Sequence, residues 1–191
     1  MLSICLCMIV KNEAHVITEC LTSVAPFVDS YSIVDTGSSD ATVEVIETFF
    51  GERDIPGRVH RRPWVNFVHN RSEALELARS HGGYALMMDA DDLLHALEPA
   101  GELTAAAYML QMTSGSTRYW YPLLFRADRR WRYEGVVHEY PVCDDADAEQ
   151  ARLAAPWWVE SRRLGARSQV SDKYQRDAAL LEDYLSEHPD D

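Results

Sequence analysis

Two carboxylates separated by one small residue follow an apolar run in the middle of the chain, in the segment Asp89-Ala90-Asp91-Asp92. In an extended backbone, the side chains of Asp89 and Asp91 would point to the same face. Hard divalent cations take oxygen ligands, and Mg²⁺ commonly uses one or two carboxylates together with substrate phosphate oxygens. The pattern therefore predicts a site for a cation and a phosphorylated ligand. Such a short motif is also typical of an acidic loop or a helix cap, so its surroundings must decide.

A second polar motif, residues 34–40, reads Val-Asp-Thr-Gly-Ser-Ser-Asp and also follows a short apolar run. Asp35 could accept hydrogen bonds from a nucleobase N–H or from a ribose hydroxyl. Gly37 would let the backbone approach a ligand closely. Asp40 is a favoured residue at a helix start, and we expect it to cap a helix that runs to Phe50. The motif thus combines a ligand contact with helix initiation.

A third polar group, Lys11-Asn12-Glu13, follows the apolar run at the N-terminus. Its place directly after a buried strand indicates a contact with a nucleoside. Asn is equally a favoured helix cap and Glu suits a first helical turn, so helix initiation is an equal alternative.

Short apolar runs alternate with helical patterns through the first half of the chain. We expect strands at 3–10, 31–34, 58–61 (edge-like) and 84–88, and helices at 12–24, 40–50 and 72–80. This alternation predicts an α/β fold with a largely parallel sheet. Ligands bind at the carboxyl ends of such strands, and all three polar motifs lie there. This convergence favours the ligand site over the acidic loop.

The second half of the chain predicts extended segments and then a helix. We expect extended segments at 108–113, 118–126 and 136–142, a hairpin turn at Gly115-Ser116, an acidic loop at 144–150 and an amphipathic helix at 173–187. We divide the chain into one domain, 1–165, and a helical extension, 166–191. The chain stops where a further helix could begin, so we expect either a truncated extension or a shortened relative.

Composition excludes several classes of protein. The net charge of −13 disfavours nucleic acid as a partner, because a phosphate backbone needs a basic face. No run of apolar residues is long enough for a membrane span. The four cysteines form no Cys-x-x-Cys pair, and Cys5 and Cys7 share one strand face, so we expect packing residues rather than disulfides or a zinc site. This usage fits a reducing, cytoplasmic compartment.

Together the three motifs resemble the family 2 glycosyltransferases of the GT-A fold, in a subgroup often followed by tetratricopeptide-like repeats. The resemblance covers nearly the whole chain, and its further matches are 64–75, with Phe67 and Asn70-Arg71, then 133–139 (Tyr-Glu-Gly-Val-Val-His-Glu) and 173–181. It implies a Rossmann-like, mostly parallel sheet flanked by helices, with a small antiparallel part and a C-terminal helix. It also implies transfer of a sugar from a nucleoside-diphosphate sugar.

The resemblance assigns roles to individual residues. It implies a nucleotide-sugar site made of Val10, Lys11, Glu13, Asp35, Thr36, Gly37, Arg71, Asp89 and Ala90. Asp91 is expected to be the direct ligand of Mn²⁺ or Mg²⁺, with Asp89 shared between the metal and the ribose. His138 is a further candidate for the metal or the diphosphate, although a lone His is more often structural.

On the acceptor side, Glu139 and Glu134 are candidate general bases, and we favour Glu139. An inverting transfer needs one carboxylate to take the proton of the acceptor hydroxyl. The chain departs from its relatives at 161–165, where Ser-Arg-Arg-Leu-Gly replaces a stretch with a His. Arg162 or Arg163 could instead neutralise the charge of the leaving group.

We expect a UDP-sugar as the donor and a peptide, glycan or lipid-linked sugar as the acceptor. A non-catalytic nucleotide-sugar-binding or scaffold domain is an alternative, because a fold does not guarantee chemistry. A nucleotidyltransferase is a third possibility, but its Gly-rich, basic phosphate loop is missing after the first strand, where Lys11-Asn12-Glu13 stands.

Overall fold

A computed structural model describes residues 3–153 and 157–166, together with Gln175, 178–179, 181–182, Tyr184 and Ser186. Within these residues, no helix has both the length and the apolar character needed to cross a membrane.

Helices and strands alternate in the first half of the chain, and strands dominate the second half. The helices are α1 (Ile17–Val24), α2 (Thr42–Gly51) and α3 (Phe67–Ala78), with 3-10 turns η1 (Ala25–Phe27) and η2 (Arg79–His81). The strands are β1 (Ile4–Val10), β2 (Ser30–Asp35), β3 (Gly57–Arg61), β4 (Tyr84–Met87), β5 (Leu93–His95), β6 (Ala107–Ser114), β7 (Thr117–Arg126), β8 (Trp131–Glu134), β9 (Tyr140–Cys143), β10 (Gln150–Arg152) and β11 (Trp158–Glu160).

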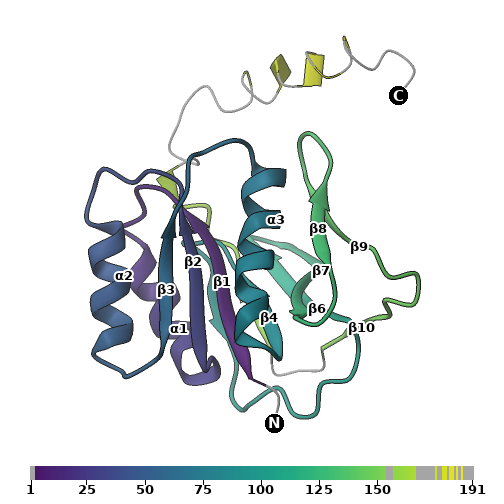
Figure 1. Ribbon diagram of the computed structural model, residues 1–191, viewed down its shortest axis with the longest axis horizontal. Coiled ribbons are helices and arrows are strands. Elements are labelled where there is room, and N and C mark those ends of the chain that lie inside the picture. The colour runs from purple at the N-terminus through teal and green to yellow at the C-terminus, as the bar shows by residue number, and fades with distance from the viewer. Residues whose placement is uncertain are drawn as a thin grey trace.

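The main sheet has the strand order β3-β2-β1-β4-β7-β6-β11-β5, with β10 also paired to β6. The strands β3, β2, β1 and β4 are parallel, whereas β7 is antiparallel to both β4 and β6. Strands β8 and β9 form a separate antiparallel pair (Figure 1). The predicted α/β fold with a mostly parallel sheet and a small antiparallel part is therefore confirmed, as is the edge position of β3.

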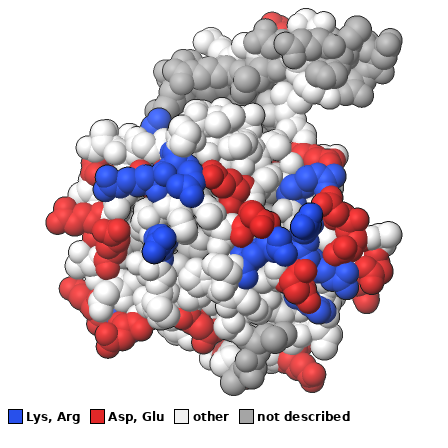
Figure 2. Space-filling view, in the orientation of Figure 1, with Lys and Arg blue, Asp and Glu red and all other residues white. Residues whose placement is uncertain are grey.

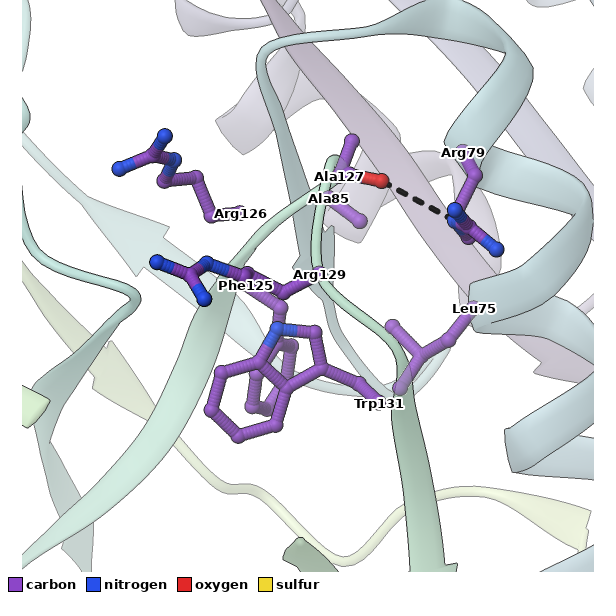
Figure 3. Close-up of a pocket in the computed structure, with 8 residues that line it drawn as sticks. All are labelled: Leu75, Arg79, Ala85, Phe125, Arg126, Ala127, Arg129 and Trp131. Atoms are coloured by element: carbon purple, nitrogen blue, oxygen red, sulfur yellow. Dashed lines mark hydrogen bonds between the residues drawn. The ribbon is translucent and has the colours of Figure 1, made fainter. Parts of the chain in front are cut away.

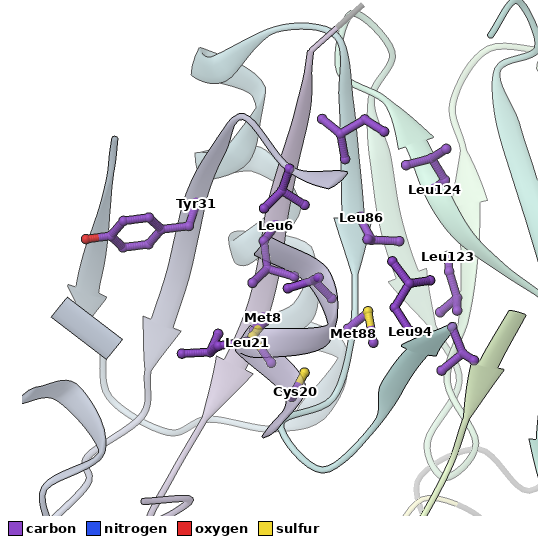
Figure 4. Close-up of a cluster of buried hydrophobic side chains, with 14 of the residues drawn as sticks. Leu6, Met8, Cys20, Leu21, Tyr31, Leu86, Met88, Leu94, Leu123 and Leu124 are labelled. Atoms are coloured by element: carbon purple, nitrogen blue, oxygen red, sulfur yellow. The ribbon is translucent and has the colours of Figure 1, made fainter. Parts of the chain in front are cut away.

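Successive side chains of β1 point to opposite faces of the sheet, so the core has two layers. Leu6 and Met8 belong to a cluster with Leu21 of α1 and Leu86 of β4, and Figure 4 shows these side chains together. Cys5 and Cys7 point to the other face and share a cluster with residues of α3. Alternate residues of a strand face opposite sides, so helices must cover both sides of this sheet. The expected packing role of Cys5 and Cys7 agrees with this burial.

Helix α1 begins at Ile17, later than the expected start at residue 12. Asn12 has a φ of 58°, which is outside the helical region, and its side-chain oxygen accepts a hydrogen bond from the N–H of Ser39 at 2.8 Å. The polar group after β1 is therefore a loop tied to the 34–40 motif, and the expected helix start there is wrong.

Two other helix starts differ in detail. Helix α3 begins at Phe67 because Asn66 caps it, accepting a hydrogen bond from the N–H of His69. Helix α2 begins at Thr42, with Ala41 at the cap position. Asp40 lies one residue earlier but still accepts hydrogen bonds from the N–H of Thr42 at 3.0 Å and from its hydroxyl. Asp40 therefore anchors the helix start without occupying the cap position.

The extended segment expected at 136–142 is only partly present. The strand β9 begins at Tyr140, because Gly135 and His138 have positive φ values of 104° and 66° that turn the chain. The strand β8, which precedes this turn, was not expected. The hairpin turn at Gly115-Ser116 joins β6 to β7 as predicted.

The helix expected at 173–187 lies largely outside the described residues. The few described positions between 175 and 186 are helical. The expected division into a domain, 1–165, and an extension, 166–191, stays a prediction.

Candidate functional site

The three polar motifs lie at the carboxyl ends of adjacent strands. Asp35 ends β2, Glu13 follows β1, and the Asp89–Asp92 segment follows β4. These strands are neighbours in the order β2-β1-β4 and run parallel, so their ends meet at one edge of the sheet (Figure 1). The structure thus brings together the carboxylates that the sequence places far apart.

Asp35 lies beside an open groove of about 460 Å³. Its side chain is buried at 4% exposure and accepts hydrogen bonds from the N–H groups of Gly37 and Ser38 at 3.3 and 3.2 Å. The groove is lined by Asp35, Gly37, Ser38, Asp40, Val43, Arg61, Arg62 and Pro63. The loop after β2 is therefore held in a shape that leaves polar groups facing a ligand-sized space.

The loops after β1 and β2 support each other. Thr36 is buried, and its N–H and hydroxyl both donate to the carbonyl of Val10, at 2.9 and 3.1 Å. Gly37 has a φ of 103°, which side-chain-bearing residues rarely adopt. Lys11 is exposed, and Ala90 is buried next to the acidic segment.

Arg71 of α3 connects two candidate site carboxylates. Its Nη2 donates to Oδ1 of Asp89 at 2.7 Å. Its Nε lies 3.1 Å from Oε1 of Glu139 without the alignment of a hydrogen bond, so this second contact is an ion pair. Burial alone would lower the pKa of Arg71, but the adjacent carboxylates, Asp89 foremost, outweigh burial and raise it. Arg71 thus holds the carboxylates of Asp89 and Glu139 close to each other.

Asp91 is held by the backbone of a distant segment. Its Oδ2 accepts hydrogen bonds from the N–H groups of Leu164 at 2.6 Å and Gly165 at 2.8 Å. The next N–H, of Ala166, donates to both carboxylate oxygens of Glu13 at 3.1 Å. Burial raises the pKa of Glu13; the Ala166 N–H opposes this rise and the charge of Asp91 adds to it. Glu13 and Asp91 therefore share one set of consecutive amides.

Asp92 adds a buried carboxyl group to the same segment. It is only 5% exposed, and burial together with the charges of Asp89 and Asp91 raises the pKa of Asp92 to about 8. The segment concentrates carboxylates that repel one another, and a nearby cation would relieve this repulsion.

The carboxylate oxygens of the site suit a cation that binds together with a phosphorylated ligand. In the part of the chain that the structure describes, no three His, Cys, Asp or Glu side chains are grouped closely enough to hold a metal ion. Mg²⁺ needs only one or two carboxylates when phosphate oxygens supply other positions, and Asp89 and Asp91 are sufficient in number. His138 is exposed and does not join them in such a group.

The other expected site residues lie in different surroundings. Glu134 forms an ion pair with Arg132 and is 42% exposed. Arg162 donates from Nε to the carbonyl of Asp91 at 2.8 Å and pairs with Glu19. Arg163 is exposed, with a φ of 58°. Arg162 is therefore adjacent to the acidic segment, whereas Glu134 lies in a surface ion-pair cluster.

Some residues at the site were not anticipated from the sequence. Tyr121 of β7 donates from its hydroxyl to the carbonyl of Glu139 at 2.9 Å. The amides of 164–166 contact two site carboxylates, and Arg61 and Pro63 line the groove. The aromatic run at 119–121 was a possible signal for Tyr121. Nothing in the sequence pattern indicates the contacts made by the backbone amides.

Two other features of the molecule are a group of surface ion pairs and a second, smaller hollow. Figure 2 shows acidic and basic side chains interleaved on the side of β8 and β9, where Arg129 pairs with Asp145 and Arg132 with Asp144. Figure 3 shows a hollow of about 10 Å³, room for about one water, between α3 and β7. It lies near Ala85, at the opposite end of β4 from the carboxylates, so it is not part of the candidate site.

Comparisons with known proteins agree with this geometry. The family model described as glycosyl transferase family 2 matches residues 5–103. A TPR repeat-containing protein of Synechococcus elongatus is 28% identical over 211 residues, covering 100% of this chain and 50% of the relative. The SPbeta prophage-derived glycosyltransferase SunS of Bacillus subtilis is 29% identical over 148 residues, covering 70% of this chain and 33% of the relative. The chain thus spans one third to one half of these relatives.

Solved structures share the fold. The crystal structure of S. aureus TarS has a TM-score of 0.60 at 16% identity, covering 97% of this chain and 43% of that chain. A complex of TarS residues 1–349 with UDP-GlcNAc has a TM-score of 0.58 at 14% identity, covering 96% of this chain and 66% of that chain.

Proposed function

We propose that this chain, which belongs to glycosyl transferase family 2, transfers a hexosyl group from a UDP-sugar to an acceptor nucleophile. One observation carries the proposal: Asp35, Glu13 and the Asp89–Asp91 segment stand at the carboxyl ends of three adjacent parallel strands. Ligands of open α/β sheets bind at such an edge.

The spacing of the strands suits a nucleoside diphosphate. Neighbouring strands lie about 4.8 Å apart, so β2 and β4 are separated by roughly 10 Å. A nucleoside in the groove beside Asp35 would therefore reach with its diphosphate toward Asp91. The solved complexes of TarS with UDP and with UDP-GlcNAc support uridine as the base.

We assign the divalent cation, Mn²⁺ or Mg²⁺, to Asp91, with Asp89 contributing. When bound, such a cation acts as a Lewis acid that stabilises the charge of the departing diphosphate. Asp89 is held by Arg71, so its carboxylate is already oriented. Arg162, which donates to the carbonyl of Asp91, is placed to add positive charge on the same side, with Arg163 next to it.

We assign the proton transfer to Glu139. An acceptor hydroxyl becomes a better nucleophile when a carboxylate takes its proton as the new bond forms. Glu139 contacts Arg71, which binds Asp89, whereas Glu134 pairs with Arg132. A single base of this kind serves direct displacement, in which the anomeric configuration inverts. The acceptor would be a peptide, a glycan or a lipid-linked sugar.

A thermal-shift panel tests the donor. Purified protein is heated with UDP, UDP-GlcNAc, UDP-glucose, GDP-mannose and dTDP-glucose, with and without Mn²⁺. We expect a UDP compound with Mn²⁺ to stabilise the fold by roughly 2–3 kcal/mol at about 100-fold excess over its dissociation constant. Asp91→Asn should lose the part of the shift that depends on Mn²⁺, whereas Asp145→Asn, on the β8–β9 side, should keep it.

Turnover separates catalysis from binding alone. We expect slow hydrolysis of the stabilising UDP-sugar, with anomer-resolved NMR detecting the inverted sugar as the first product. Binding without turnover under every acceptor condition would favour the non-catalytic domain, and a retained anomer would contradict direct displacement. No stabilisation by any nucleotide would contradict the proposed donor site.

A further inference from the structure

Three consecutive backbone N–H groups, those of Leu164, Gly165 and Ala166, point at carboxylates of the candidate site. We call this segment the 164–166 latch. Two of its amides donate to Oδ2 of Asp91 at 2.6 and 2.8 Å, and the third donates to Glu13. A run of N–H groups is a binding site for anions, and here two side-chain carboxylates fill it.

The segment before the latch is anchored at several points. The N–H of Ser161 donates to the carbonyl of Thr113 at 2.8 Å, at the end of β6. Arg162 donates from Nε to the carbonyl of Asp91, and the ring Nε2 of His15 lies 3.1 Å from the carbonyl of Leu164. The latch is therefore placed by contacts with three separate parts of the fold.

The absence of a side chain at Gly165 favours the close approach of the latch. A Cβ atom added there would lie 3.3 Å from Cγ of Asp91 and 3.3 Å from both carboxylate oxygens of Glu13. Gly165 does not have a positive φ, so glycine is favoured at this position by the limited space and not by the backbone conformation. Any larger residue would press on both carboxylates at once.

We infer that the 164–166 latch occupies Oδ2 of Asp91 and competes with the divalent cation for this carboxylate. This inference rests on the proposed function, because it takes Asp91 as the cation ligand. Two N–H groups use both lone pairs of Oδ2, so a cation can bind this oxygen, or both oxygens of the carboxylate together, only by displacing them. The positive ends of the N–H dipoles also weaken the attraction of the carboxylate for a cation.

The latch gives the site a defined order of events. Cation and diphosphate together release the amides of 164–166 from Asp91, and the released amides are then free to donate to phosphate oxygens. Metal alone should bind weakly, since its binding to Oδ2 breaks two hydrogen bonds to a charged group, a penalty that lowers affinity by about 10-fold or more.

Hydrogen exchange tests the release directly. We expect the backbone amides of 164–166 to exchange slowly in the metal-free protein and at least several-fold faster with saturating Mn²⁺, measured by mass spectrometry on peptides that span 161–166. Asp91→Asn should show fast exchange at Leu164 and Gly165 without Mn²⁺, because the neutral amide is a weaker acceptor.

A glycine substitution tests the competition. Gly165→Val should raise the affinity for Mn²⁺ without nucleotide by about 10-fold, measured by calorimetry, because the latch can no longer reach Asp91. Gly51→Val is the matched control, since a Cβ there meets open space at the end of α2. The control should leave Mn²⁺ affinity unchanged.

The outcomes separate the latch from the proposed function. One outcome would overturn the latch alone. In it, Mn²⁺ binding depends on Asp91, but Mn²⁺ does not change the exchange of 164–166 and Gly165→Val does not change Mn²⁺ affinity. No Mn²⁺ binding at all, with or without UDP, would overturn both the assigned cation site and the latch. If Gly165→Val does not fold, the exchange measurement on the wild-type chain still decides.

Discussion

The guanidinium group of Arg71 donates a hydrogen bond of 2.7 Å to the carboxylate of Asp89, across 18 positions of sequence. The side chain of Arg71 is only 13% exposed, whereas that of Asp89 is 48% exposed. The pair thus joins a buried cation of α3 to a carboxylate that is half exposed to solvent. Substitutions that alter this pair are expected to affect both the fold and donor binding.

Arg71→Lys is expected to weaken donor binding and stability together. A lysine is a point charge and cannot contact Asp89 and Glu139 through a rigid planar fork. Removing one partner of a fully buried pair costs about 3–5 kcal/mol, and the exposure of Asp89 reduces our estimate to roughly 1–2 kcal/mol. Urea unfolding and UDP titration measure the two effects. Arg132→Lys, in a surface ion-pair cluster, should change stability by less than about 0.5 kcal/mol; an equal loss in both variants would argue against a special role for Arg71.

Glu139→Gln is expected to lower the rate of sugar transfer or donor hydrolysis by roughly 100-fold or more, because a positioned base contributes about 10²–10⁴-fold. Affinity for UDP should change by less than about three-fold, since the proton acceptor does not hold the nucleotide. Glu134, five residues earlier, pairs with Arg132, so Glu134→Gln serves as the control and should keep most activity. A larger loss in Glu134→Gln than in Glu139→Gln would reverse the assignment.

Asp35→Asn is expected to reduce UDP affinity by about 10-fold and to lower stability by roughly 1 kcal/mol. The carboxylate organises the loop after β2 through the N–H groups of Gly37 and Ser38, and hydrogen bonds to charged groups are worth about 1.5–3 kcal/mol. Asp29→Asn is a matched control, because Asp29 accepts the N–H of Ile4 at the opposite end of the sheet. The control should lose stability yet bind UDP normally. Calorimetric titration and thermal melting of both variants distinguish the two effects.

Asp40 is expected to make stability depend on pH in the acidic range. Partial burial by itself would raise the pKa of Asp40, but hydrogen bonds from Thr42 and from the N–H of Ala14 outweigh it and lower the pKa. The unfolded chain therefore binds this proton at a higher pH than the folded chain. The stabilising contribution is complete above the unfolded pKa of about 3.9 and is lost as pH falls through the folded value.

The corresponding measurement compares urea unfolding of the wild type and Asp40→Asn between pH 6 and pH 3. The wild type should be more stable by roughly 0.5–1 kcal/mol at pH 6, the usual size of a contact at a helix start, and the difference should shrink toward pH 3. Glu102→Gln, on an exposed loop, should show no such trend. A difference that stays constant or grows on acidification would contradict the role of Asp40.

The sequence by itself determined the parallel part of the sheet and the edge at which the candidate site lies. Apolar runs followed by polar residues are local patterns, so they indicated strands at 3–10, 31–34 and 84–88 without any knowledge of contacts. Parallel strands place their carboxyl ends on one edge, and this rule grouped Glu13, Asp35 and Asp89 correctly. The helix start expected at residue 12 failed because the φ of Asn12 depends on its bond to Ser39, which is a long-range contact.

Only the tertiary structure decided which of these groups touch one another. The contact of Arg71 with Glu139 depends on how β8 packs against α3, and the hydrogen bonds from Leu164 and Gly165 to Asp91 join residues more than 70 positions apart. Backbone N–H groups carry no side-chain signal, so no sequence pattern reveals where a loop will present them. The sheet edge follows from local periodicity, whereas the pairing of charges and amides at that edge follows from strand order and loop path.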